Sequence, residues 1–162
     1  MLENTISKDG LLEASVLEKC YAEALDLSNE VAGYFKINKK DQFKDLNVDI
    51  MSGYTLECNR ITTSVIQSMS WCLMQKAVHA GEIDADEASK DEHRLSQTEL
   101  YTMPIACETD QFPENFINFS NRARNLYKQI ERLDRIIYDA VHAEGNSPVQ
   151  ELMEQIESFG KV

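Results

Sequence analysis

The chain has 162 residues, a length that suits one domain able to bury a sizeable core without disulfide or metal staples. Its 28 acidic and 16 basic residues give a formal net charge of −12 at pH 7, which argues against a strong general affinity for nucleic acid or an anionic membrane, although a local basic patch can still act. Six glycines and three prolines are few, and this composition favours long helices over a turn-rich β fold.

The start of the chain does not combine a basic end, an apolar core and a small-residue cleavage site, so we expect no secretion signal. The most apolar stretch, residues 65–78, is too short and too interrupted by polar groups to span a bilayer. None of the four cysteines belongs to a CxxC motif, and three lie within helical apolar patterns, where a reduced thiol acts as a small hydrophobe. These features predict a reduced, cytoplasmic protein that does not enter a membrane.

The first predicted helix runs from about Leu11 to Phe35, with Asp9 as a candidate N-cap. Apolar residues recur in it at steps of three or four, and acidic residues occupy much of the remaining surface, as expected for a solvated side. The apolar positions are Val16, Cys20, Ala24, Leu27, Val31 and Tyr34. Residues 36–48 lose this period and predict a connecting loop.

The second predicted helix begins near Asp49 or Ser52, both suitable N-caps, and ends at Ala80, where Gly81 is placed to terminate it. Residues 60–83 of this segment show two apolar stripes on roughly opposite faces, whereas a surface helix needs only one. The second stripe predicts either a central core helix or a subunit interface. The first stripe holds Val65, Ile66, Met69, Cys72, Leu73 and Ala77, and the second, the predicted dimer interface, holds Trp71, Met74 and Val78.

Residues 82–111 form a polar, acidic middle segment, with nine acidic residues against only Lys90 and Arg94. Part of it, about 84–95, can extend as an exposed helix. The remainder, through Pro104, predicts a long loop, and loops of this length are often functional or disordered.

The third predicted helix runs from about Gln111 to Ala143, with Asp110 as its cap and Pro113 tolerated in its first turn. One apolar stripe continues over many turns, from Phe116 to Val141. Residues 145–148 then break the chain, and a short amphipathic tail follows. We therefore predict an all-α fold, an antiparallel three-helix bundle over residues 1–145 with a long acidic loop between helices two and three, and a C-terminal tail over residues 146–162.

Nothing in the sequence argues for an enzyme, a metal or a cofactor, because GxGxxG, GxSxG, HExxH and phosphate-binding glycine loops are all missing. A phosphotransfer bundle needs an exposed histidine on a helix that continues beyond it. His79 does not fit this requirement, because Ala80-Gly81-Glu82 end the helix directly after it. Asp139 and His142 give one carboxylate–x–x–His step, whereas a di-metal bundle needs two Glu-x-x-His steps and two further glutamates. Cys107 lies among acidic residues that disfavour a reactive thiolate.

Two features suggest contacts with protein partners. A charged strip on the third helix lies away from its apolar stripe; it is either neutralised by nearby acids, as a solvated face, or docks an acidic segment of another protein. The tail either folds back on the bundle or acts as a peptide ligand for a groove. The strip consists of Arg124, Lys128, Arg132 and Arg135, and the tail anchors are Val149, Leu152, Met153, Ile156 and Phe159.

The run RITTSVIQSMSWCLMQKAVHAGEI, residues 60–83, resembles the signature of the RcdA (regulator of CtrA degradation) family of alphaproteobacterial proteins. The matching residues are Thr62, Thr63, Gln67, Ser70, Trp71, Lys76, Ala77, Val78, Gly81 and Glu82. Supporting matches are Arg132-Leu133-Asp134, Ser147-Pro148 and Phe159-Gly160. The chain departs from the family at Ser64, where an arginine is usual, at Val65-Ile66, where Leu-Met is usual, and at Cys72-Leu73, where Leu-Leu is usual.

The resemblance implies a non-enzymatic three-helix bundle that can form a homodimer and that acts as an adaptor in regulated proteolysis. Such an adaptor helps deliver cell-cycle regulatory proteins to the ClpXP protease, together with a co-adaptor, and its C-terminal tail engages the protease machinery. Because Ser64 replaces the arginine that is usual in the family, any partner contact that relies on that arginine loses one positive charge. The alternative is a dimeric structural or regulatory protein that acts through a partner unrelated to proteolysis.

Overall fold

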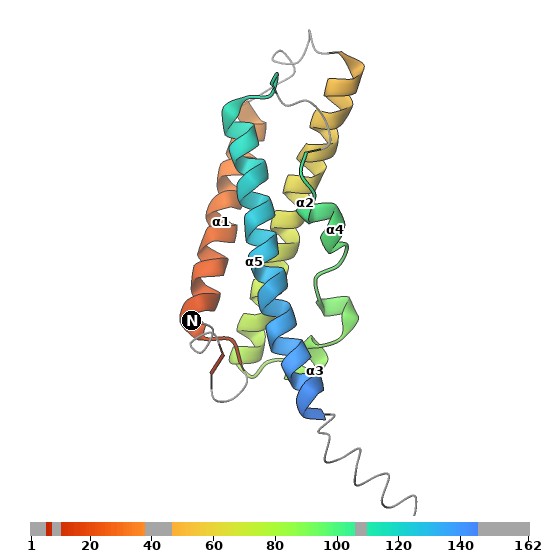
Figure 1. Cartoon of the computed structure of the whole chain (residues 1–162). Coiled ribbons are helices and arrows are strands. Elements are labelled where there is room, and N and C mark those ends of the chain that lie inside the picture. The colour runs from red at the N-terminus through yellow and green to blue at the C-terminus, as the bar shows by residue number, and fades with distance from the viewer. Residues whose placement is uncertain (1–5, 8–10, 38–46, 106–109, 146–162) are drawn as a thin grey trace, which may run out of the picture.

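A computed structural model describes residues 6–7, 11–37, 47–105 and 110–145 of the chain, with side chains as far as Tyr138. The described residues form five α-helices and one 3-10 helix (Figure 1), so the prediction of an all-α fold is confirmed. Three of these helices are long and lie side by side, while the others are short and lie between the second and third of them in sequence.

Helix α1, Ala14–Ile37, buries one face made of residues spaced three or four apart. The predicted apolar positions are buried in it, except Val16, which is half-buried, and Leu17 joins them. The helix begins three residues later than predicted; Leu12, just before it, is only 1% exposed and pairs with Ile6 in an isolated β-bridge.

Helix α2, Val48–His79, begins with Asn47 as its N-cap, where Asn47 Oδ1 accepts a hydrogen bond of 2.9 Å from the backbone N–H of Ile50. The expected caps Asp49 and Ser52 instead lie inside the first turns. At the other end Gly81 has φ +70°, as its predicted role requires. The N–H of Gly81 bonds to Val78 O and that of Glu82 to Ala77 O, which is the Schellman arrangement that satisfies the last carbonyls.

We expect the change Gly81→Ala to lower the free energy of unfolding by about 1 kcal/mol, because alanine is strained at positive φ. The matched control is Gly33→Ala, inside α1, where an added Cβ meets nothing within 4 Å. That change should raise the same quantity by about 0.5–1 kcal/mol, since alanine is the better helix former. Chemical denaturation of the two variants measures both effects, and a loss at both positions would contradict the helix-end geometry.

The acidic middle segment is more ordered than predicted. It contains α3, Ala85–Ala88, the 3-10 helix η2, Asp91–His93, and α4, Thr98–Thr102. Figure 1 shows it running from the end of α2 back along the bundle towards the start of α5. Two of its side chains, Ala88 and Tyr101, are buried against the bundle, and the Tyr101 ring lies 5.3 Å from that of Tyr127 on α5. We call residues 83–105 the strap.

Helix α5, Glu114–Gly145, runs parallel to α2 rather than antiparallel, which corrects the predicted topology. Three hydrogen bonds between the two helices share an offset of 63 positions, namely Glu57–Ser120, Trp71–Asp134 and Gln75–Tyr138. An antiparallel pair would make the two residue numbers change in opposite directions. The strap is the physical reason, because it returns the chain to the end of the bundle at which α2 begins.

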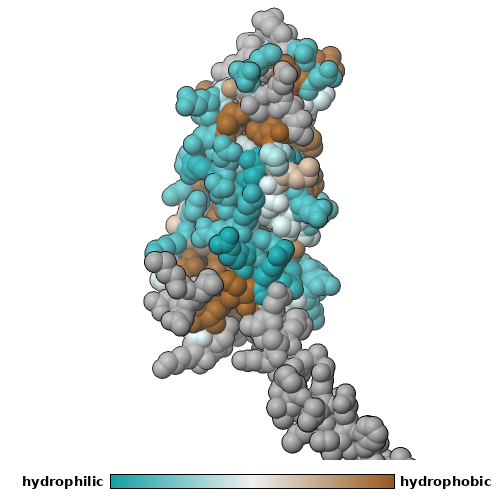
Figure 2. All heavy atoms as spheres, viewed as in Figure 1, coloured by the Kyte–Doolittle hydropathy of each residue, from teal (hydrophilic) through white to brown (hydrophobic). Residues whose placement is uncertain are grey.

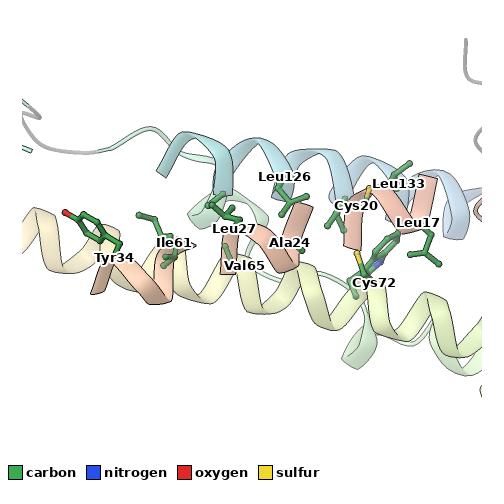
Figure 3. Packing of buried hydrophobic residues seen from close by; sticks show 14 of the residues in the cluster. Leu17, Cys20, Ala24, Leu27, Tyr34, Ile61, Val65, Cys72, Leu126 and Leu133 are labelled. Carbon is green, nitrogen blue, oxygen red and sulfur yellow. The ribbon is translucent and has the colours of Figure 1, made fainter. Parts of the chain in front are cut away.

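The hydrophobic core lies between α1, α2 and α5 (Figure 3), where the buried side chains of α1 meet those of the other two. Aromatic rings close the end at which α2 begins: the Tyr54 ring centroid lies 4.3 Å from that of Phe116 and 5.5 Å from that of Phe112. At the surface, Arg122 of α5 pairs with Glu30 of α1 at 2.7 Å, and Lys76 of α2 pairs with Glu18 of α1. No helix among the described residues has the length and apolar content to cross a membrane.

Candidate functional site: the outer faces of α2 and α5 and the seam between them

A polar seam joins α2 to α5 near the C-terminal end of α2. The indole Nε1 of Trp71 donates to Asp134 Oδ1 at 2.8 Å, and Arg94 of the strap donates to Asp134 Oδ2 at 2.8 and 3.0 Å. Trp71 is 2% exposed and Asp134 is 4% exposed. The carboxylate therefore fixes a tryptophan, two helices and the strap at one buried point. Trp71 and Asp134 are both residues that carry the family resemblance, and the fold gives them a shared structural role.

A second polar cluster lies nearer the N-terminal end of α2. Glu57, which is 3% exposed, accepts hydrogen bonds from Arg60 at 2.9 Å and from the Ser120 hydroxyl of α5. Arg60 and Arg124 both donate to the Met103 carbonyl, at 2.8 Å for Arg124. We call these side chains the Glu57 cluster. It holds the end of the strap through backbone carbonyls, so the hold depends little on which side chains the strap carries.

The predicted charged strip is divided by the fold. Arg124 belongs to the Glu57 cluster, with its side chain only 12% exposed, and burial lowers its pKa from the usual value. Lys128, Arg132 and Arg135 are exposed. Arg135 pairs with Glu131 one turn away, as expected for a solvated face whose charges are neutralised locally. In contrast, neither Lys128 nor Arg132 forms an ion pair with any described residue.

The outer face of α5 carries an additional feature that the sequence reasoning missed. Between Asn118 and Arg135, every exposed side chain of α5 is an amide or a cation. Figure 2 shows hydrophilic side chains running over α5 on this side of the molecule. The signal was present in the sequence, because asparagines recur every three or four residues opposite the apolar stripe. The exposed residues are Asn118, Asn121, Asn125, Lys128, Gln129, Arg132 and Arg135.

The predicted dimer interface is also divided. Trp71 is buried within the chain itself, so its side chain is not available at the surface of this fold, whereas Met74 and Val78 are half-buried. The expectation that the whole second stripe contacts another subunit is corrected at Trp71. The buried indole N–H of Trp71 requires a hydrogen-bond acceptor, and Asp134 of the same chain supplies it. The second stripe is to this extent part of the core, and the dimer itself stays a prediction.

The outer face of α2 is free of charge over most of its length. The helix contains only four acidic or basic residues, of which Glu57 and Arg60 are buried and Lys76 is paired with Glu18. Its exposed apolar side chains include Leu56, Ile66 and Leu73, each about half exposed, at 50%, 56% and 49%. The exposed residues from Ser52 onward are Ser52, Thr55, Leu56, Asn59, Thr62, Ile66, Ser70, Leu73, His79 and Ala80. We call this surface the uncharged face.

The residues considered for chemistry do not gather at one place. His79 is exposed at the end of α2, and the side chain of His142 and the whole of Cys107 lie outside the described part of the chain. His93 Nε2 lies 3.5 Å from carboxylate oxygens of Glu87 and Glu92, which is one possible ligand trio in the described residues, but the Lys90 ammonium pairs with Glu87.

The described thiols are structural rather than reactive. Cys20 and Cys72 are buried and Cys58 is half-buried. Burial raises the pKa of Cys72 to about 12 and that of Cys58 to about 11, so both thiols stay protonated at neutral pH. The predicted tail anchors, from Val149 to Phe159, lie outside the described residues.

Comparison with known proteins gives one family. The chain matches the family model described as "Protein of unknown function (DUF1465)" over residues 8–159. No curated protein and no solved structure matches it. The resemblance to the RcdA family is not confirmed by these comparisons and stays a prediction. Because the match covers nearly the whole chain, including the seam and both outer faces, the protein belongs to the DUF1465 family.

Proposed function

We propose that this protein is a non-enzymatic adaptor in regulated proteolysis, which helps deliver cell-cycle regulatory proteins to the ClpXP protease. The observation that supports it best is the outer face of α5, where Lys128 and Arg132, which form no ion pair with another described residue, are exposed beside amides on a chain of net charge −12. Such a face suits an acidic segment of a partner through charge complementarity. In this proposal α1, α2 and α5 act as a rigid three-helix bundle in the cytoplasm, and the tail contacts the delivery machinery.

Truncation after Gly145 is expected to leave the described helices folded and to abolish delivery. The reason is that the core and both polar clusters lie N-terminal to this position, whereas the proposed tail contacts lie beyond it. The measurement is degradation of a candidate cargo by purified protease, with full-length or truncated protein and with circular dichroism as the folding control. Equal degradation with both forms would remove the tail from the proposal.

The alternative is a dimeric structural or regulatory protein unrelated to proteolysis, and the uncharged face of α2 favours a dimer in either case. Two copies of a chain with net charge −12 repel each other over most of their surface, and this repulsion is smallest where both surfaces are neutral. We therefore place the proposed homodimer contact on this face, next to Met74 and Val78. Affinity capture from cell extract that recovers neither a protease component nor a co-adaptor would favour the alternative.

Leu73→Asp is expected to convert the proposed dimer into a monomer that remains helical. Leu73 is 49% exposed, so the added carboxylate is solvated in a single chain, but it introduces like-charge repulsion and a desolvation penalty between two copies. Sedimentation gives the mass and circular dichroism the helix content. The matched control is Leu25→Asp on α1, which is 37% exposed and should leave the mass unchanged. A wild-type protein that is monomeric at all concentrations would exclude this interface.

A further inference from the structure

The side chains on the outer face of α5 have unused hydrogen-bonding capacity. The side chains of Asn118 and Asn125 form no hydrogen bond with other described residues. Asn121 Oδ1 accepts from Arg124 Nη1 at 2.9 Å, which leaves the two N–H donors of its amide unused. These three residues are spaced at i, i+3 and i+7, so they form one row along the helix. We call them the asparagine row.

A primary amide matches the peptide group, because each has both a donor and an acceptor. A helix rises about 1.5 Å per residue, so the row spans about 10 Å, and this equals about three residues of an extended chain at about 3.3 Å each. Asparagine side chains at this spacing can therefore bond to the main chain of one extended segment, whatever its side chains are.

The cations continue the row towards the C-terminal end of the helix. Lys128 and Arg132 are exposed and unpaired among the described residues, and they lie one and two turns beyond Asn125. The width of this cationic surface is limited on the α1 side, where Glu23, Asp26 and Glu30 are exposed close enough to raise the pKa of Arg122. The surface is thus about one helix wide, roughly 10 Å.

We propose that the outer face of α5 binds a partner segment that is extended and acidic, with the asparagine row bonding to its main chain and Lys128 and Arg132 pairing with its carboxylates. This inference rests on the adaptor function proposed above and specifies the chemistry of its cargo. A single extended chain fits a surface of this width. A nucleic acid duplex, about 20 Å wide, would place phosphates over the acidic residues of α1, which favours the peptide.

The test uses full-length protein and a fluorescent peptide of about 12 residues, half of them Glu or Asp, which is longer than the roughly 26 Å from Asn118 to Arg135. Fluorescence anisotropy should show binding that weakens as salt rises. A peptide with Gln and Asn in place of Glu and Asp should bind at least tenfold more weakly. The same acidic peptide with N-methylated backbone amides keeps its charge but loses its donors, and it should also bind several-fold more weakly.

The variant pairs separate the two kinds of contact. N118A/N125A should weaken binding about tenfold with the same salt dependence, whereas K128Q/R132Q should weaken it and flatten the salt dependence. The matched controls carry the same kinds of change on α1, outside both proposed contact surfaces: Asn29→Ala and K19Q/K36Q should leave peptide binding to the α5 face unchanged. All of these positions are exposed, so the variants should remain folded.

Three results would overturn the inference: equal binding of the neutral peptide, equal binding of the N-methylated peptide, or no effect of N118A/N125A. Tighter binding of a short single-stranded oligonucleotide than of the acidic peptide would assign the face to nucleic acid instead. These outcomes need no protease. A failure here with intact cargo delivery would therefore reject the α5 surface and leave the adaptor function standing, and binding without delivery would do the reverse.

Discussion

Trp71→Ala is expected to lower the free energy of unfolding by about 3–5 kcal/mol, the range for truncating a large buried aromatic side chain. Two losses combine at this position. The indole is 2% exposed, so its removal leaves a cavity between α2 and α5, and Asp134 loses the N–H that donates to Oδ1. Arg94 still donates to Oδ2, so the carboxylate keeps a charged partner. Denaturant unfolding followed by circular dichroism measures the loss.

Two further variants separate these contributions. Trp71→Phe retains most of the apolar volume but removes the indole donor, so it should lose much less stability than Trp71→Ala. Leu25→Ala on α1, which is 37% exposed and lies outside the proposed dimer contact, should change stability only slightly. If Trp71→Ala yielded folded monomers with little loss of stability, the indole would belong to a subunit interface and not to this core.

Glu57→Ala should be similarly damaging, with an expected loss of about 3–5 kcal/mol, because it leaves Arg60 buried without its anion. The side chains of Glu57 and Arg60 are only 4% and 8% exposed, so bulk solvent screens their charges little in this fold. Arg124 and the Ser120 hydroxyl lose an acceptor as well. Because Arg60 and Arg124 also hold the Met103 carbonyl, the end of the strap should loosen with them.

Hydrogen exchange locates this second effect. In Glu57→Ala, amides of α4 should exchange faster relative to those of α1 than in the wild type, because local opening follows the loss of local contacts. The control is Glu18→Ala, which breaks the solvated Lys76–Glu18 pair on the surface and should change stability by less than about 1 kcal/mol. If α4 exchange were unchanged in Glu57→Ala, the contacts of Tyr127 with the Tyr101 ring and the Ser96 carbonyl would hold α4 without the Glu57 cluster.

The strap differs from the prediction of a partly helical segment followed by a long loop, because it contains α4 and is attached to the bundle. Its sequence is acidic and has little apolar periodicity, which is the usual pattern of a solvated segment. It is nevertheless held in place, because Arg94 bonds to Asp134, and the carbonyls of Ser96 and Met103 accept hydrogen bonds from Tyr127 and Arg124. Every residue has a backbone carbonyl, so the sequence does not show which carbonyls accept hydrogen bonds from distant side chains. This kind of attachment is seen only in the tertiary structure.

For the outer faces of α2 and α5, the sequence likewise predicts the composition but not which residues remain accessible. The composition of the α5 face was readable, since the cations and asparagines occupy fixed positions opposite the apolar stripe. Which cations lack an ion pair within the described part of the chain was not readable, because Arg124 is held by the Met103 carbonyl, 21 positions away, and by Glu57, 67 positions away. In the same way, the stripe that contains Trp71 reads as a surface for a neighbour until Asp134 is placed beside it.

The sequence by itself determined the three long helices, the buried faces of α1 and α5, and the termination of α2 at Gly81, because these depend on local periodicity and on the backbone freedom of one glycine. The tertiary structure decided that α2 and α5 run parallel, that the strap returns along them, and which polar residues are buried. Those outcomes depend on hydrogen bonds and ion pairs between residues far apart in the chain, whose partners are set by the packing of whole helices and not by any local pattern.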